Sequence, residues 1–357
     1  ARVRNPVYYR QIDILKEDLH LSMAVNPELA AANEISRVLL FPETSKVETF
    51  MKGKVELVEY AVRDDSPLVG LSLGELYRKF QIQVLICAVK RKDEVYIPDG
   101  DFVLQAGDKM HIAASHQNLK NFFKSLMKKT VRIKNVLICG GGHLCFYLAL
   151  QLLQVGMQVK IIEKDSSRCE TLCELLPKAT VINADATSHD LLLEEGIGEA
   201  DAVVALTGMD EENIIMALFA KTQGVKKIIA KVNEDTRAQM VEGLGIDSIV
   251  SAKSATADAI LRYVRARKNS HDSANVESMY RLVNGQVEAQ EFIIKKECKY
   301  TNIPLKNLPT KPNTLIACIG RDRKVIIPNG DSHIEVGDSV IVVTKGRPID
   351  NFIDILA

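Results

Sequence analysis

The sequence predicts an α/β protein in which doubly wound parallel-sheet domains alternate with small α+β domains. Three observations lead to this prediction. Residues 131–250 alternate continuous apolar strands with helical segments, which is typical of a parallel sheet buried on both faces. A run of three glycines joins the first of these strands to its helix. Two further segments, 50–127 and 279–357, repeat each other.

Matching turn motifs define the repeat. Ile97-Pro98-Asp99-Gly100-Asp101 returns 230 residues later as Ile327-Pro328-Asn329-Gly330-Asp331, and nine of the thirty positions in 97–126 are identical in 327–356. Upstream the spacing becomes 232, so that Gly53 and Glu59 pair with Gly285 and Glu291. A period of this length indicates duplication of whole domains. Residues 1–3 align in the same way with 230–232, so we expect the chain to be a piece of a longer protein.

Four segments are therefore expected along the chain. They are the C-terminal part of a first parallel-sheet domain (1–48), a first small domain (49–128), a second parallel-sheet domain (131–267) and a second small domain (279–357). The polar stretch 268–278 has few apolar residues and is expected to be a linker.

Apolar periodicity and turn residues predict the elements of each segment. In the first sheet domain, Pro27 opens a helix over 29–40. The first small domain is expected to have strands at 55–62 and 84–89, a short helix at 71–80 and a closing helix at 115–127, which the second copy repeats up to 351–356. The second sheet domain is expected to have strands at 136–139, 159–162, 180–182, 202–206, 227–231 and 249–250, with helices at 143–155, up to 176, at 211–222 and at 255–266.

The composition excludes several classes of protein. The 46 Lys and Arg residues balance 46 Asp and Glu residues, whereas a nucleic-acid-binding protein presents a basic face. No run of 18 apolar residues is present, so no membrane-spanning helix is expected, and no signal peptide is visible. Seven cysteines without a Cys-x-x-Cys motif indicate reduced thiols rather than a zinc site or a disulfide framework.

The glycine turn carries the main functional prediction. Gly140, Gly141 and Gly142 follow the strand 136–139 and lead directly into a helix, where glycine allows the backbone to approach a pyrophosphate. Glu163 ends the next strand, where a carboxylate binds ribose hydroxyls and disfavours a 2′-phosphate. This pattern predicts a Rossmann-like domain that binds NAD rather than NADP; the alternative is a similar sheet without a ligand.

Other candidates follow the later strands. Asp185 and Ala186 are placed to meet the adenine, or Asp185 serves only a turn. Thr207 and Gly208 are expected to contact the ligand, whereas Asp210 is expected to cap the following helix. Lys231 is either a phosphate ligand or a solvated charge, and His143 is a possible neutral donor at the helix start.

The sequence contains no evident catalytic grouping. No Ser-His-Asp or Cys-His arrangement and no metal-ligand spacing stands out, and neither small domain offers an acid–base pair. The repeated Ile-Pro-x-Gly-Asp motif is interpreted as turn chemistry, with a pocket for a second effector as the alternative. We therefore expect a binding protein and not an enzyme.

Together the glycine turn, Glu163, the 185–187 segment, the 205–207 segment and the repeated Ile-Pro-x-Gly-Asp motif resemble the TrkA family of Trk potassium-uptake regulatory subunits. The resemblance is to the tandem form, in which each half pairs an RCK (also called KTN) nucleotide-binding domain with a smaller RCK C-terminal domain. It covers the whole chain. Cys145 stands where the family has the third glycine of its motif.

The resemblance implies a function and a set of ligand contacts. It implies a cytoplasmic regulatory protein, peripheral at the inner face of the cell membrane, that forms a homo-oligomer and gates a membrane potassium-translocating subunit. The expected cofactor is NAD or NADH, with ATP or ADP as alternatives. The expected contacts are Gly140, Gly141, Gly142, His143, Leu144, Glu163, Thr207, Gly208 and Lys231. The rival functions are an NAD-dependent oxidoreductase and a ligand-sensing regulatory domain of another transporter.

Overall fold

The computed structural model describes residues 1–5, 8, 12, 21–81, 83–126, 132–241, 244–268, 274–322, 324–346 and 349–357. The chain folds into two compact units. One comprises Ala1–Pro42 and Val131–Ala259, and the other Glu43–Thr130 and Ile260–Ala357.

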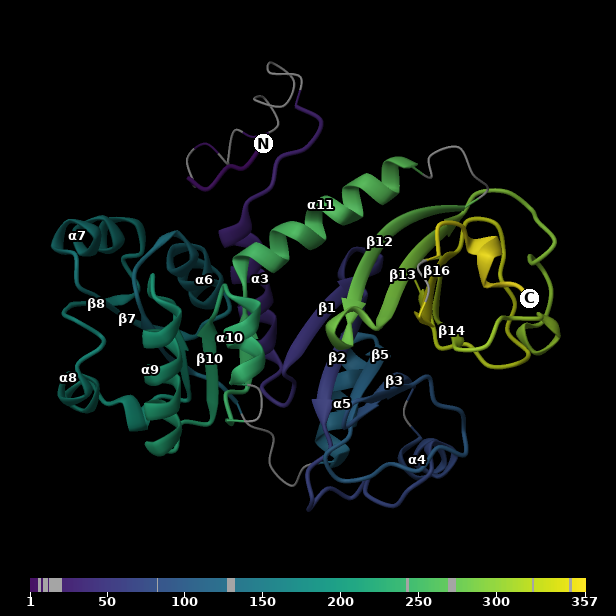
Figure 1. Cartoon of the computed structure of the whole chain (residues 1–357), viewed down its shortest axis with the longest axis horizontal. Coiled ribbons are helices and arrows are strands. Elements are labelled where there is room, and N and C mark those ends of the chain that lie inside the picture. The colour runs from purple at the N-terminus through teal and green to yellow at the C-terminus, as the bar shows by residue number, and fades with distance from the viewer. Residues whose placement is uncertain are drawn as a thin grey trace. The chain divides into compact units, whose positions relative to one another are not determined.

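The first unit contains a six-stranded parallel sheet with the order β11-β10-β9-β6-β7-β8 (Figure 1). This is the doubly wound order expected of a Rossmann-like domain, and its switch point lies between β6 and β9. The fold class predicted from the sequence is confirmed. The strands are β6 (Asn135–Cys139), β7 (Gln158–Glu163), β8 (Thr180–Asn183), β9 (Ala202–Ala205), β10 (Lys227–Lys231) and β11 (Ser248–Val250).

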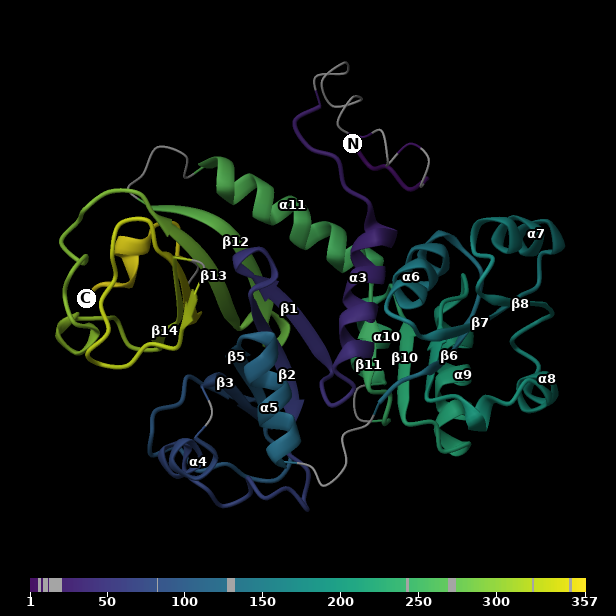
Figure 2. The same cartoon turned by 180° about the vertical axis from the view of Figure 1, so that it is seen from behind.

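Helices cover both faces of this sheet. Helix α9 covers one face, and α6, backed by α3, covers the other (Figures 1 and 2). The helices are α3 (Pro27–Leu40), α6 (His143–Gln154), α7 (Ser166–Leu175), α8 (His189–Glu194), α9 (Asp210–Thr222), α10 (Asp235–Met240) and α11 (Ala252–Lys268), the last of which runs past residue 259.

The segment 1–42 contains a parallel bridge similar to one in the second sheet domain. Arg2 pairs with Val25 in a parallel bridge, and at the equivalent place Lys231 pairs with Val250 between β10 and β11. Helix α3 begins with Pro27 in its first turn and with Asn26 as N-cap. It packs on α6, where Gln151 Nε2 donates to Asn33 Oδ1 at 2.7 Å.

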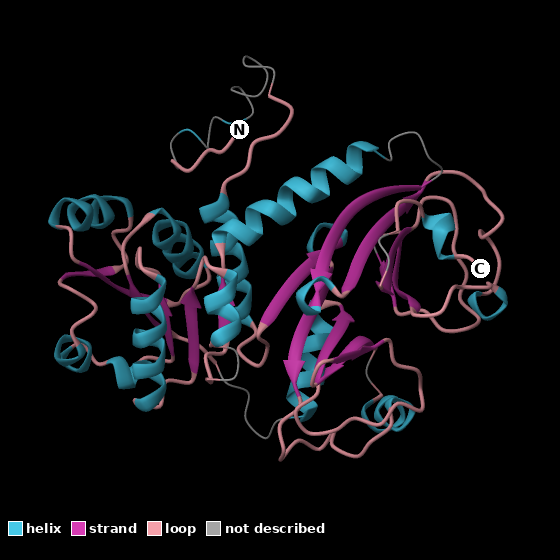
Figure 3. Ribbon diagram, viewed as in Figure 1, coloured by secondary structure: helices cyan, strands magenta, loops and turns pink. Residues whose placement is uncertain are grey.

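The second unit contains two five-stranded antiparallel sheets (Figure 3). Their orders are β1-β2-β5-β3-β4 and β12-β13-β16-β14-β15, which is the same topology twice and confirms the duplication. The strands are β1 (Lys46–Phe50), β2 (Val55–Ala61), β3 (Leu85–Arg91), β4 (Glu94–Tyr96), β5 (Lys109–Ala114), β12 (Ala274–Leu282), β13 (Val287–Ile294), β14 (Thr314–Arg321), β15 (Lys324–Ile326) and β16 (Ser339–Lys345).

One strand at the start of each small domain was not predicted from the sequence. β1 begins at Lys46, and it pairs antiparallel with β2. β12 begins at Ala274, so the C-terminal part of the polar stretch 268–278 is a strand rather than a linker, whereas 269–273 lies outside the described residues. Antiparallel pairing with β13, in which Ala274 lies opposite Ile294, explains why a polar sequence is extended there.

Within the described residues, the second copy has no counterpart of either α-helix of the first. The first copy has α4 (Leu73–Phe80) and α5 (His116–Leu126), and at the matching places the second has the 3₁₀ turns η4 (Leu305–Asn307) and η5 (Phe352–Ile355). Pro309 falls where α4 continues in the first copy, and Gly346, at φ +91°, stands where α5 begins. The predicted helix at 351–356 is therefore wrong.

The repeated Gly-Asp motif is explained by turns and buried ion pairs. The N–H groups of Asp101 and Asp331 donate to Asp99 Oδ1 and Asn329 Oδ1, so each copy of the motif forms a turn of the predicted kind. The later aspartate of each copy is buried and accepts two hydrogen bonds from one arginine, Arg91 on Asp108 and Arg321 on Asp338.

The two small domains share one apolar core. Phe50, Met51 and Leu57 of the first copy cluster with Leu282 and Val343 of the second, among other buried residues. The backbone N–H of Met51 also donates to Glu291 Oε2 at 3.1 Å. The small domains therefore form one folding unit within the second part of the chain.

A buried histidine makes the first copy sensitive to acid. His111 is 2% exposed, and its Nε2 lies 3.7 Å from Glu59 Oε2 without accepting or donating a hydrogen bond within the described part of the chain. Burial lowers the pKa of His111, although Glu59 opposes this. The pKa of His111 is thus below its unfolded value of about 6.5. Neutral His111 is compatible with the fold above that pH, and stability is lost as the pH falls below it because protonation of His111 favours the unfolded state.

We expect His111→Ile to reduce this acid sensitivity, because Ile341 occupies the equivalent position in the second copy. The measurement is thermal unfolding of both proteins between pH 7.5 and pH 5.5. Parallel decreases in melting temperature for the two proteins would contradict the assignment to His111.

Candidate functional site

The glycine turn lies at the switch point of the sheet, where ligands bind in folds of this type. Gly140 has φ +105°, and a Cβ atom at this position would lie 3.0 Å from the backbone of Leu206 and Thr207. The loops that follow β6 and β9 are therefore in close contact. Only glycine combines this φ with this approach.

A hydrogen bond from Gly141 connects the glycine turn to the end of β7. Its N–H donates to Glu163 Oε2 at 2.5 Å, and Glu163 Oε1 accepts a hydrogen bond from Asp165 N at 2.9 Å. A Cβ atom on Gly141 would lie 2.7 Å from Leu172 Cδ1 and 2.9 Å from Glu163 Cγ. The Glu163 carboxylate, which is predicted to bind the ribose hydroxyls, therefore lies directly beside the glycine turn that is predicted to bind the phosphates.

Gly142 differs from the other two glycines because its space is open. A Cβ atom there would meet nothing within 4 Å, and its φ of −62° suits any residue. It is the N-cap of α6, whose first N–H groups have no helical partner and can bind an anion. Leu144 is buried, so it can offer a ligand only its backbone.

His143 is the first residue of α6 and lies among positive charges. Burial lowers its pKa, and the cations Arg168 and Arg4 lower it further, whereas Glu28 opposes them. A neutral imidazole at this position can donate or accept one hydrogen bond.

Arg168 was not predicted from the sequence. Its Nε donates to the carbonyl oxygen of Gly141 at 2.6 Å, and its Nη2 to that of Gly142 at 3.3 Å. It therefore holds a positive charge beside the glycine turn. The only local signal is its place three residues after Asp165, the N-cap of α7.

Asn213 joins the other two predicted loops. Its Oδ1 accepts hydrogen bonds from Thr207 N and Thr207 Oγ1, both at 2.8 Å, and its Nδ2 donates to the carbonyl oxygen of Lys231 at 2.9 Å. Asn213 shares the buried face of α9 with Met216 and Ala217, and a polar residue on an apolar face is the signal that could have revealed it.

Lys231 reaches back towards the switch point. Its Nζ lies 3.5 Å from the carbonyl oxygen of Leu206, which is a weak contact. Burial lowers the pKa of Lys231, while Asp210 and Glu28 oppose this effect. Among the described residues this half-buried cation has no close partner carboxylate, so it is suited to an anionic ligand. Gly208 adds no side chain in this region and faces open space.

Asp210 does not cap its own helix, contrary to the prediction. Helix α9 begins at Asp210, and Met209 is its N-cap. Asp210 Oδ2 instead accepts hydrogen bonds from Asn233 N (2.9 Å) and Glu234 N (3.1 Å), just before α10. The carboxylate thus stabilises the N-terminus of a different helix, because the chain after β10 passes beside it.

The segment after β8 is engaged in local structure. Asp185 Oδ1 accepts hydrogen bonds from Thr187 N (3.0 Å) and Thr187 Oγ1 (2.9 Å), which forms an Asx turn. Ala186 is buried in an apolar cluster of the sheet domain, so it can offer a ligand only its backbone, whereas Asp185 is exposed.

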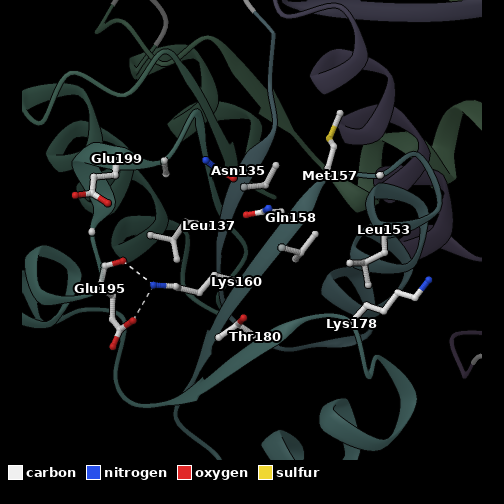
Figure 4. A pocket seen from close by; sticks show the side chains of 15 residues that line it. Asn135, Leu137, Leu153, Met157, Gln158, Lys160, Lys178, Thr180, Glu195 and Glu199 are labelled. Atoms are coloured by element: carbon white, nitrogen blue, oxygen red, sulfur yellow. Dashed lines mark hydrogen bonds and ion pairs between the residues drawn. The ribbon is translucent and has the colours of Figure 1, made fainter.

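A separate pocket of about 690 Å³ lies at the other end of the strands of this sheet, away from the glycine turn (Figure 4). The amino ends of β6, β7 and β8 line it, and Lys160 Nζ donates to Glu195 Oε2 at 3.0 Å and to the Glu195 carbonyl oxygen at 2.9 Å. Parallel sheets bind ligands at their carboxyl ends, so this pocket is distinct from the predicted site.

Comparison with known proteins identifies the family. Residues 136–252 match the family model of the TrkA-N domain, and residues 57–127 and 289–357 match that of the TrkA-C domain. A curated relative from Halomonas elongata, the Trk system potassium uptake protein TrkA, is 31% identical over 351 residues, which cover 97% of this chain and 76% of that protein. This chain belongs to the TrkA family.

Other relatives agree with this assignment to the TrkA family. The Trk system potassium uptake protein TrkA homolog 1 of Methanosarcina mazei is 30% identical, with 96% of this chain and 75% of that protein covered. The solved structure of the GsuK RCK domain has a TM-score of 0.56 at 18% identity and covers 97% of this chain and 72% of that chain, which shows the same fold. No helix within the described ranges is long and apolar enough to cross a membrane.

Proposed function

We propose that this chain is the nucleotide-binding regulatory subunit of a Trk-type potassium uptake system. The observation that carries the proposal is the glycine turn held by Glu163 at the switch point, in a chain that matches TrkA proteins over almost its whole length. Two loops fastened to each other around an open helix N-terminus are suited to bind a nucleotide and to change position when it leaves.

The proposed ligand is NAD or NADH, with ADP or ATP as alternatives. A fold relative described as the GsuK channel bound to NAD has a TM-score of 0.55 to this chain and covers 97% of it. In our proposal the pyrophosphate lies over Gly142 and the first turn of α6, with His143 and Arg168 beside it. Glu163 takes the adenosine ribose, and Lys231 lies on the other side of the switch point.

The proposed mechanism is a shift between two conformations. A nucleotide that binds one arrangement of the loops more tightly than the other changes their populations, and an attached partner senses the change. The partner is a membrane potassium-translocating subunit. We further propose that the protein acts as a homo-oligomer at the cytoplasmic face of the membrane, and that it catalyses no reaction on its nucleotide.

Calorimetric titration tests the ligand and its selectivity. We expect NAD or NADH to bind more tightly than NADP, because the Glu163 carboxylate repels a 2′-phosphate. Glu163→Gln should weaken NADH binding by roughly tenfold, the loss of one hydrogen bond to a charged group, and should narrow the preference over NADP. The matched control is Glu194→Gln, since Glu194 is exposed at the end of α8, outside the predicted site.

Tighter binding of NADP than of NAD would refute the role given to Glu163. Absence of binding by NAD, NADH, ADP and ATP would refute the proposed function itself. Steady consumption of NADH with an added carbonyl substrate would favour the oxidoreductase alternative.

A further inference from the structure

Glu28 belongs to the N-terminal segment of the chain, yet it is held against the glycine-turn helix. It lies in the first turn of α3, whose N-cap Asn26 donates from Nδ2 to the hydroxyl of Tyr147 on α6 at 2.8 Å. The Tyr147 hydroxyl in turn donates to the carbonyl oxygen of Arg4 at 3.3 Å. These bonds fix residues 4 and 26–28 near the first turn of α6.

The two oxygens of Glu28 have different surroundings. Oε1 accepts a hydrogen bond from Arg4 Nε at 2.5 Å and lies 3.5 Å from Arg2 Nη2. Oε2 is buried, in a residue that is only 6% exposed, and within the described part of the chain it accepts no hydrogen bond. A buried acceptor without a donor is costly, so a ligand that supplies a donor gains affinity there.

The packing of α3 shows on which side of the site Glu28 lies. Helix α3 packs on α6 and on β11, which lies next to β10 on the β9 side of the switch point, and the charge of Glu28 opposes the lowering of the pKa of His143 and of Lys231. Glu163, the proposed ribose ligand, lies at the end of β7, on the other side of the glycine turn. In this fold a dinucleotide places its two nucleosides on opposite sides of the switch point. Glu28 therefore lies on the side of the second nucleoside.

We propose that Glu28 selects dinucleotides: its unpartnered oxygen accepts a hydrogen bond from a hydroxyl or carboxamide of the second nucleoside of NAD or NADH. The inference rests on the proposed nucleotide function and adds a specificity residue from outside the 131–267 domain. The γ-phosphate of ATP brings only acceptors to the same place, so the carboxylate repels it, whereas ADP ends at the pyrophosphate and does not reach Glu28. Arg4 and Arg2, which contact Oε1, offset part of this repulsion.

The experiment measures the affinities of the 357-residue chain for NADH, ADP and ATP, the last with and without Mg²⁺. For Glu28→Gln we expect NADH affinity to fall roughly tenfold, as for loss of a hydrogen bond to a charged acceptor. The ADP affinity should stay equal, and the ATP affinity should increase because the repulsion of its γ-phosphate is gone and Arg4 is released. The ratio of NADH to ADP affinity is therefore the readout.

Controls separate this effect from a folding defect. Glu28→Asp keeps the charge but withdraws the oxygens by one methylene, so it should also lower the ratio. Glu194→Gln should leave the ratio unchanged. Equal losses for NADH and ADP in either Glu28 variant would overturn the proposal, as would an unchanged ratio. A selective loss of Mg²⁺-dependent ATP binding would overturn it in favour of a cation site, whereas a wild-type chain that binds no nucleotide would refute the proposed function instead.

Discussion

Replacing Gly142 with leucine is expected to lower the affinity for NADH by roughly a hundredfold or more, because a side chain there occupies the space before the first turn of α6 that the phosphates need. The fold should tolerate the change, since a Cβ atom on Gly142 meets nothing within 4 Å and its φ is −62°. The measurement is calorimetric titration, with circular dichroism of the same sample to monitor the fold.

The neighbouring glycine provides the contrast. Gly141→Ala brings a Cβ atom to 2.7 Å from Leu172 Cδ1, so this variant should lose stability as well as affinity. Gly100→Leu is the matched control, because Gly100 is exposed in a turn of the second unit and also has open space around it. Normal NADH affinity in folded Gly142→Leu would mean that the phosphates bind elsewhere.

Replacing Asp108 with alanine is expected to lower the free energy of unfolding of its unit by about 3–5 kcal/mol, the range for breaking a buried ion pair. Asp108 is fully buried and accepts hydrogen bonds from Arg91 Nε (2.8 Å), Arg91 Nη2 (2.7 Å) and Gln105 N (2.8 Å). Its removal leaves a half-buried guanidinium and a backbone N–H without their partner.

Hydrogen exchange of the β5 amides should report this loss directly, since the chain has no tryptophan and its two units need not unfold together. Asp101→Ala is the control from the same motif. Asp101 is exposed and uses only its backbone N–H in the turn, so its replacement should change stability by less than about 0.5 kcal/mol. Equal effects of the two substitutions would show that the Arg91 pair contributes little.

Local sequence signals predicted the parts of the fold that depend on local chemistry. Each strand of the parallel sheet is a continuous apolar run between helices, and the glycine turn marks the first crossover. The repeat predicted the second small domain. However, short 3₁₀ turns stand where the first copy has helices, because Pro309 and Gly346 are unfavourable in a helix. A single residue that is incompatible with a helix outweighed the similarity of its neighbours.

The site was predicted only in part, for a related reason. Gly141 and Glu163 follow adjacent strands, so topology alone brings them together. Glu28 and Tyr147 are more than a hundred residues apart, and no local pattern relates α3 to α6. Asp210 also has the sequence features of a helix cap, but its carboxylate accepts hydrogen bonds from the backbone of residues 233 and 234, which are distant in the sequence.

The shared core of the small domains has a consequence for how the duplicated halves can evolve. Met51 of the first copy lies beside Gly320 of the second, where a Cβ atom would lie 2.7 Å from the Met51 sulfur. In the repeat, Gly320 matches Lys90 and Met51 matches Val283, so the corresponding contact would join Lys90 to Val283. Only one of the two matching contacts can therefore be made in this way. The two copies have diverged at these positions and are no longer interchangeable, so a substitution in one must be accommodated by the other rather than by its own repeat.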